Sequence, residues 1–177
     1  MLADPSRSCI VLLNMTRGDR RGGEKAALGL TASLALLPAA RELFGIRMIA
    51  VGEYERDALP RPVVASFEHL AGDTLSLWWY PSLEQALSAS GVGTVFLGGA
   101  FLEEELLITA LEGARQGYDI RLLSDLSLAR QEADRPLVLN RLAHYGIFAV
   151  TVRQTLLEWA VGLGDEAVSR RIIELLS

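Results

Sequence analysis

Short apolar runs alternate along the chain with segments of helical periodicity. The first run, Cys9–Met15, contains no charged residue and ends at the polar, glycine-rich segment Thr16–Lys25. Because a strand covered on both faces forms a continuous apolar run, we expect Cys9–Asn14 to be a central strand of a parallel sheet. The other expected strands are Ile46–Val51, Leu75–Tyr80, Thr94–Gly98, Asp119–Leu123 and Ile147–Thr151.

Between these runs the apolar positions recur at helical spacing, and glycine closes several of the segments. The expected helices are Thr31–Phe44, Ser82–Ser90, Glu103–Gln116, Arg135–Tyr145, Val152–Leu163 and Asp165–Leu176. Gly52–Pro62 is predicted to be a loop, and a short helix is considered around Ser66–Leu70. This alternation predicts the α/β class, as a three-layer α/β/α sandwich with a doubly wound, mostly parallel sheet. The length of 177 residues fits a single domain over 1–177, in which 164–177 is an additional C-terminal helix.

In a doubly wound sheet, ligands bind at the carboxyl ends of the strands. The loops expected there follow Asn14, Val51, Tyr80, Gly98 and Leu123. Candidate functional residues are therefore sought in these loops.

Composition narrows the function classes. The formal net charge of −5 argues against a nucleic-acid-binding protein, which would normally show a basic face. Half of the residues are hydrophobic, more than a small monomer readily buries, so we expect a homo-oligomer. The longest charge-free stretch, Gln85–Leu102, is interrupted by glycines and predicts no membrane span. With no secretory signal pattern at the N-terminal end, the expected location is cytoplasmic.

Few residues offer metal or nucleophile chemistry. Cys9 is the single cysteine, and the two histidines, His69 and His144, lie far apart. These counts exclude an intramolecular disulfide and offer no recognisable zinc ligand set or Ser-His-Asp arrangement. We therefore expect neither a metal nor a cofactor. Among the 17 positively charged residues, all but Lys25 are arginine.

The Thr16–Lys25 loop follows a strand and is faintly similar to a phosphate-binding loop. The required Lys-Ser or Lys-Thr pair is missing, because Gly23 is followed by Glu24, Lys25 and Ala26. Three interpretations stay open: a solvated basic loop, an anion site made by Arg17, Arg20 and Arg21, or nucleotide binding.

The segment Val95–Asp125 carries the most specific pattern. A strand ends in glycines, a helix follows a short turn, Thr109 and Ala110 lie within the helix, and Gly117 and Tyr118 lead to a strand that ends in Asp125. This segment resembles the isochorismatase-like, or cysteine hydrolase, superfamily. The resemblance runs from about Cys9 to Trp159 and implies a Rossmann-like fold. It continues at Ile10–Met15, at Ala40, Arg41, Gly45 and Ile46, and at Leu139–Gly146 followed by Val150 and Thr151.

The resemblance also assigns positions to the catalytic residues of the family, and all of them have changed. The position of the family's cysteine is Glu105, that of its aspartate is Asn14, and that of the glutamine two residues later is Thr16. The lysine belongs near the strand before Ser82, where this chain has Trp78. An amide cannot accept the thiol proton and an indole cannot supply positive charge. Cys9 lies five residues before Asn14 and is expected to be buried at the wrong end of the sheet.

Several candidates have two interpretations. Glu105 either starts a helix as a solvated charge or points into the former nucleophile pocket as a base or ligand-holding group. Trp78–Tyr80 forms either core and subunit-interface packing or the wall of a pocket for a flat ligand. His144 is expected to interact with a helix C-terminus, and Asp125 to organise a loop and a helix. The pocket candidates are Asn14, Thr16, Trp78, Tyr80, Gly99, Ala100 and Glu105.

The expected function is that of an isochorismatase-like protein with a degenerate active site, which serves as a non-catalytic binding or assembly protein. Its partners would be further copies of itself and a small-molecule ligand. The alternative is a divergent hydrolase that cleaves a small amide or vinyl ether without cysteine, with water activated by Glu105, Asp19 or an arginine of Arg17–Arg21.

Overall fold

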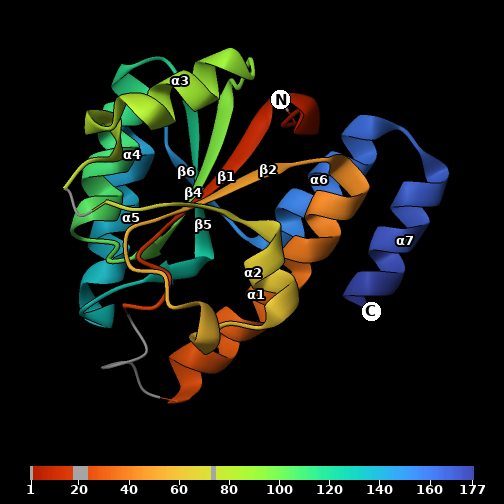
Figure 1. The fold of residues 1–177 in the computed structure, drawn as a ribbon, viewed down its shortest axis with the longest axis horizontal. Coiled ribbons are helices and arrows are strands. Elements are labelled where there is room, and N and C mark those ends of the chain that lie inside the picture. Colours follow the sequence, from red (N-terminus) through yellow and green to blue (C-terminus); the bar gives the residue numbers. More distant parts are fainter. Residues whose placement is uncertain (1, 18–23, 73–74) are drawn as a thin grey trace.

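A six-stranded, all-parallel sheet forms the middle layer of the molecule (Figure 1). The computed structural model describes residues 2–17, 24–72 and 75–177. For residues 24–31 it describes only the helical backbone and not the side chains. The spatial order of the strands is β3-β2-β1-β4-β5-β6. Their bounds are β1 Ser8–Leu13, β2 Arg47–Val51, β3 Glu68–Leu70, β4 Thr94–Ala100, β5 Asp119–Leu128 and β6 Phe148–Val150. The predicted α/β class and doubly wound sheet are confirmed.

Helices cover both faces of this sheet. Figure 1 shows α3, α4 and α5 on one side and α1, α2, α6 and α7 on the other. Their bounds are α1 Glu24–Phe44, α2 Arg61–Ser66, α3 Pro81–Ala89, α4 Glu105–Arg115, α5 Arg135–His144, α6 Val152–Leu163 and α7 Glu166–Leu176. Short 3₁₀ helices lie at Pro5–Arg7, Arg56–Ala58, Leu77–Trp79 and Glu132–Asp134. Within the described residues, no helix combines the length and the apolar character needed to cross a bilayer.

Strand β1 explains why the pattern Cys9–Asn14 indicates a central strand. All six of its residues are buried, and it pairs with β2 on one side and with β4 on the other. Successive side chains point to opposite faces, so Ile10 and Leu12 join the core under α1 and α6, whereas Cys9 and Val11 join the core under α3, α4 and α5. Both cores need apolar residues from one strand, which is why the run is continuous.

The region after β2 differs from the prediction. Leu75–Tyr80 is not a strand: it contains the 3₁₀ helix Leu77–Trp79, capped by the Ser76 hydroxyl, which accepts from the backbone N–H of Trp78. The third strand is instead Glu68–Leu70, where a helix was considered, and α2 begins inside the expected loop Gly52–Pro62. Strand β3 lies at the sheet edge and is largely exposed, so it lacks the apolar pattern by which strands are recognised.

Two elements extend beyond their predicted ends. Helix α1 begins at Glu24 instead of Thr31 and continues through Pro38. Strand β5 continues to Leu128, and its register with β4 shifts between Leu97 and Gly99. The extended part of β5 still contributes buried side chains, including Leu126.

Candidate functional site

The order of the strands reverses between β1 and β4, where doubly wound folds place their ligand crevice. Four of the predicted pocket residues lie here: Asn14 follows β1, Gly99 and Ala100 end β4, and Glu105 begins α4. Gly99 pairs with Leu13 in the same place, at the last position of the β1–β4 ladder. The peptide bond between Ala100 and Phe101 is cis.

Asn14 connects the ends of three strands. Its side-chain Nδ2 donates to the Ala100 carbonyl oxygen (3.3 Å), and its Oδ1 accepts from the backbone N–H of Glu53 (2.9 Å), in the loop after β2. Its backbone has a φ of 48°, a left-handed conformation that asparagine tolerates better than most residues. A Cβ at Gly52 would overlap the Asn14 oxygen, so the close approach requires glycine there. The Asn14 amide therefore serves as a cross-link between loops.

Glu105 is buried in the crevice. The residue is 8% exposed, and one carboxylate oxygen forms an ion pair with the guanidinium of Arg17. The other oxygen accepts from the backbone N–H of Phe101 (3.5 Å). Glu105 does start α4, but the expectation of a solvated charge is wrong. Its carboxylate faces two donors of the protein itself.

Arg17 carries the second half of this arrangement. Its Nε donates to Glu53 Oε1 (2.7 Å), so one guanidinium joins the loop after β2 to the start of α4. Burial by itself lowers the pKa of Arg17, but the hydrogen bonds to Glu53 and Glu105 outweigh that effect and raise its pKa above the ordinary value. The guanidinium therefore stays charged, and we call Arg17, Glu53 and Glu105 the ion-pair triad.

Thr16 holds the loop that carries Glu53 of the triad. It is buried, and its Oγ1 accepts from the backbone N–H of Glu55 (3.2 Å), in the loop that carries Glu53. The expectation of a solvated basic loop is wrong for Arg17. Arg20, Arg21 and Asp19 lie outside the described residues, as do the glycines of the phosphate-loop comparison, and the side chain of Lys25 is not described either.

The two glutamates before Glu105 bind the loop after β5. Glu104 holds Arg130 through two hydrogen bonds of 2.6 and 2.9 Å, and Glu103 accepts from the backbone N–H of Gln131 (2.9 Å). The hydrogen bond from Arg130 is the largest influence on Glu104 and lowers the pKa of its carboxyl. Arg130 also lies 4.3 Å from the centre of the Phe101 ring. A second ion pair therefore joins the start of α4 to the loop after β5.

Trp78 lies against α4, outside this meeting point. Its Nε1 donates to the Thr109 carbonyl oxygen (2.8 Å), its ring stacks on Tyr118 (centroids 5.1 Å apart), and a Cβ at Gly113 would overlap it. Trp78 is therefore a packing residue of the core. Trp79 is 65% exposed, and half-buried Tyr80 packs against Gly72.

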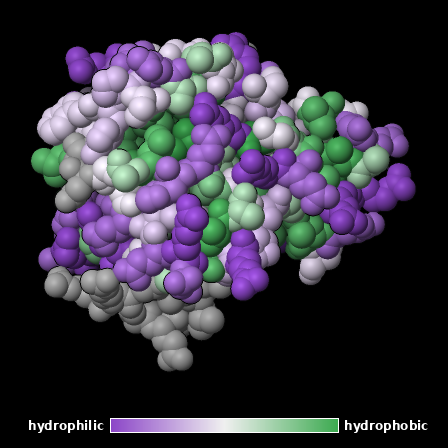
Figure 2. All heavy atoms as spheres, in the orientation of Figure 1, coloured by the Kyte–Doolittle hydropathy of each residue, from purple (hydrophilic) through white to green (hydrophobic). Residues whose placement is uncertain are grey.

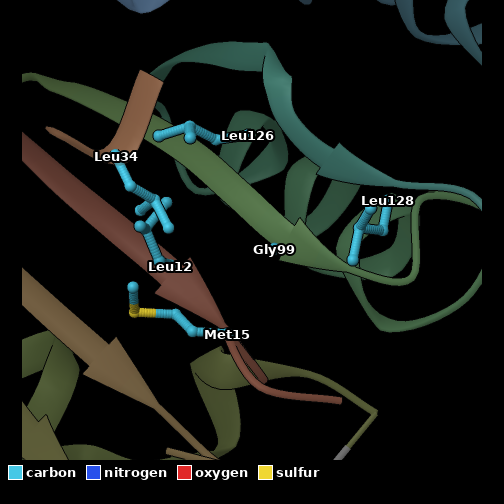
Figure 3. A pocket seen from close by; sticks show the side chains of 6 residues that line it. All are labelled: Leu12, Met15, Leu34, Gly99, Leu126 and Leu128. Carbon is cyan, nitrogen blue, oxygen red and sulfur yellow. The ribbon is translucent and has the colours of Figure 1, made fainter. Parts of the chain in front are cut away.

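A narrow apolar cavity lies on the α1 side of β1 and β4 (Figure 3). Its volume is about 10 Å³, the space of roughly one water-sized sphere. Its described lining residues are Leu12, Met15, Leu34, Gly99, Leu126 and Leu128. Among them, no side chain offers a polar group that could orient a ligand.

Asp125 and His144 occupy the positions expected of them. Both carboxylate oxygens of Asp125 accept from the backbone N–H of Val152 (3.1 Å each), at the start of α6, and one also accepts from the Ser33 hydroxyl (2.8 Å) on α1. His144 lies in the last turn of α5, where its Nδ1 is 2.7 Å from the Asn140 carbonyl oxygen. Both residues organise helices.

Cys9 lies in the first half of β1 and is fully buried. Burial raises the pKa of its thiol to about 12, so the thiolate is negligible at neutral pH. In the described chain no three His, Cys, Asp or Glu side chains group as metal ligands would.

Sequence reasoning missed Glu53 altogether. The available signal was its place: it follows Gly52 directly after β2, the strand beside β1, so its loop opens on the same crevice. The sequence indicated Arg17 only together with the other arginines of its loop, as part of an anion site or as a group that activates water. Its two partners are distant in the sequence, and no spacing rule connects them.

Comparison with solved protein structures identifies the fold. The MAR1 ribonuclease from Caenorhabditis elegans matches with a TM-score of 0.82 and 17% identity, over 99% of this chain and 92% of that one. An isochorismatase-like hydrolase from Alkaliphilus metalliredigens matches with a TM-score of 0.64 and 21% identity, over 86% of this chain and 99% of that one. This chain has the isochorismatase-like fold.

A third solved structure with the isochorismatase-like fold is the YcaC gene product from Escherichia coli, described as an octameric hydrolase of unknown specificity. It matches with a TM-score of 0.80 and 17% identity, over 97% of this chain and 89% of that one. No family model matches the sequence. No curated protein matches it either.

Proposed function

We propose that this isochorismatase-like chain is a single-domain, non-catalytic binding or assembly protein. The observation that carries the proposal is the ion-pair triad: the position that the family resemblance assigns to the nucleophile is Glu105, and its carboxylate is engaged by Arg17. A carboxylate held between a guanidinium and a backbone N–H has no free approach to a substrate carbon.

The position assigned to the general base supports the same proposal. Asn14 has no ionisable proton acceptor, and its amide already donates to Ala100 and accepts from Glu53. The residues that fill the place of the lysine, Trp78 and Trp79, supply no positive charge, and Trp78 is committed to α4. The side chains at these three positions, Asn14, Trp78 and Glu105, are thus all engaged by contacts within the chain, which supports the proposal.

The partners we propose are further copies of the chain and a small-molecule ligand. Self-association is supported by the octameric description of the YcaC product and by the large apolar side chains exposed on α6 and α7, Val161 and Ile173 among them. For the ligand, the small apolar cavity beside Gly99 leaves room for little more than a water molecule, so binding there would require the cavity to widen.

Small amides provide the test, because pyrazinamidase from Pyrococcus horikoshii and N-carbamoylsarcosine amidase from Thermoplasma acidophilum share this fold. We expect purified protein to release no ammonia from pyrazinamide, N-carbamoylsarcosine or similar amides above the rate of buffer, and to leave isochorismate intact. Ammonia release that is lost in folded Glu105→Ala would overturn the proposal in favour of the divergent hydrolase. Cys9→Ser is the matched control, since its thiol lies outside the crevice.

A further inference from the structure

The sheet ends at β6, and no strand of the described residues pairs with its outer edge. Phe148 and Ala149 are exposed, Phe148 by 63% of its surface. An edge strand presents backbone donors and acceptors that pair readily with another strand. Natural edges are commonly protected by charge or proline, whereas Phe148–Val150 contains neither.

Apolar surface continues from this edge across two helices. One groove runs between β6 and α6, and a second runs between α6 and α7; Val161 lines both, so they form one surface. We call this surface the β6 face. Figure 2 shows hydrophobic and polar residues interspersed at the end of the molecule where α7 lies. The apolar residues that line the β6 face are Leu2, Ala149, Val150, Leu157, Val161 and Ile173.

Two of these side chains lie far out of the core. Val161 is 68% exposed and Ile173 is 60% exposed. Helix α7 buries Ile172 and Leu176 against the rest of the chain, so Ile173 extends from a different side of the same helix. Exposed apolar side chains that are grouped on one surface, with polar residues around them, are a feature of interaction sites.

We propose that the β6 face is the contact through which two copies of this chain associate about a twofold axis. This inference rests on the assembly half of the proposed function. A twofold axis beside β6 sets two edge strands antiparallel and continues the sheet from one copy into the next. It also lays α6 and α7 of one copy beside those of the other.

Charge supports a second copy as the occupant. The whole chain has a net charge of −5, so most of its surface repels an identical surface. The β6 face carries charges of both signs. Glu158, in the β6–α6 groove, forms an ion pair with Arg121, and the α6–α7 groove is lined by both Glu166 and Arg170. A twofold axis that passes between Glu166 and Arg170 sets the glutamate of each copy against the arginine of the other. The structural match to the octameric YcaC product covers 97% of this chain.

Trp79 provides the matched control. It is nearly as exposed as Val161, at 65%, but its 3₁₀ helix contacts α3 and α4, and it lines neither of the two grooves. The alternative contact is the aromatic run Trp78–Tyr80, for which subunit-interface packing is one interpretation of the sequence. Trp78 is buried, so within that run Trp79 is the residue available to a partner.

Light scattering coupled to size exclusion, at 1–50 µM protein, measures the assembly of wild type, Val161→Glu, Ile173→Glu and Trp79→Glu. We expect wild type to exceed the 19.3 kDa monomer mass, both β6-face variants to weaken association at least tenfold, and Trp79→Glu to behave as wild type. Circular dichroism checks that each variant is folded. Monomeric wild type, or dissociation by Trp79→Glu alone, would overturn the inference.

Hydrogen exchange on wild type avoids dependence on any variant. The amides of Phe148–Val150 should be protected at high concentration and lose protection on dilution, in step with the fall in mass. Concentration-independent exchange at these amides, in a protein that does assemble, would contradict the β6 face. Turnover of amides would contradict the proposed non-catalytic function and leave this result unaffected, so the two failures are distinguishable.

Discussion

The crevice and the β6 face differ in whether their side chains find partners within the chain. In the crevice, the charges of Arg17, Glu53 and Glu105 are drawn together and find their partners within the chain. On the β6 face, apolar side chains such as Val161 and Ile173 stay in solvent. The comparison teaches that a protein's remaining interactions are best sought where groups lack a complement. By that criterion the charged groups of the crevice need no further partner, whereas the apolar side chains at the sheet edge do.

Gly99→Ala should produce the largest effect, because it separates the two strands that form the crevice. Gly99 has a φ of 116°, and a Cβ there would overlap the backbone of Leu13. We expect a loss of more than about 3 kcal/mol in the free energy of unfolding, or failure to fold. Urea denaturation measures it. Gly91→Ala, with a φ of 64° and no atom near its Cβ position, is the control and should cost about 1 kcal/mol.

Arg17→Ala tests whether the crevice is held by its charges. Removal of the guanidinium leaves the buried Glu105 carboxylate with one donor, and we expect a loss of about 2–4 kcal/mol in the free energy of unfolding. The double variant Arg17→Met, Glu105→Met should recover most of that loss, because it removes both charges. If Arg17→Ala unfolds at the same urea concentration as wild type, the triad contributes nothing to stability.

The Glu104–Arg130 pair predicts a smaller, pH-dependent effect. The folded-state pKa of Glu104 is lowered, so its contribution is present above the unfolded value near 4.5 and is lost as the pH falls through the folded-state pKa. Glu104→Gln should therefore unfold at lower urea than wild type at pH 7, and the difference should shrink at pH 3. Both partners are substantially exposed, so the difference should be smaller than that of Arg17→Ala. A constant difference at both pH values would argue against this pair.

Val161→Ser should leave the stability of the isolated subunit nearly unchanged, within about 0.5 kcal/mol. Its side chain is exposed, so the monomer gains little from it. The measurement is urea unfolding at a concentration low enough to keep the protein monomeric. A large loss under those conditions would mean that Val161 belongs to the fold, and the contrast with the crevice would disappear.

The sequence predicts the part of this structure that depends on burial and period. The apolar run Cys9–Asn14 predicts a strand between two cores. The glycines that follow α4 and α5 indicate where these helices end. Prediction from the sequence fails where the local pattern of a segment differs from the role that the segment has in the folded protein. The run around Trp78 is as apolar as a strand, yet Ser76 caps it as a 3₁₀ helix and Thr109 holds the indole.

The candidate site was predictable in its location but not in its chemistry. The sequence predicts a site at the carboxyl ends of the strands, with Asn14 and Glu105 among its candidates, and the structure brings those residues together where the strand order reverses. Whether Glu105 faces solvent depends on Arg17, which is 88 residues away, and on Glu53 in a third loop. Such pairings arise from the fold as a whole, and helical or strand periodicity contains no information about them.

The central position of β1 also bears on how the chain is made. Ser8 pairs with Thr94, so one side of an entirely buried strand waits for a partner 86 residues later in the chain. At ribosomal rates of about 5–20 residues per second, that wait lasts roughly 4–17 s. During synthesis this apolar strand edge is therefore accessible to chaperones or to neighbouring nascent chains until β4 has been made and pairs with it.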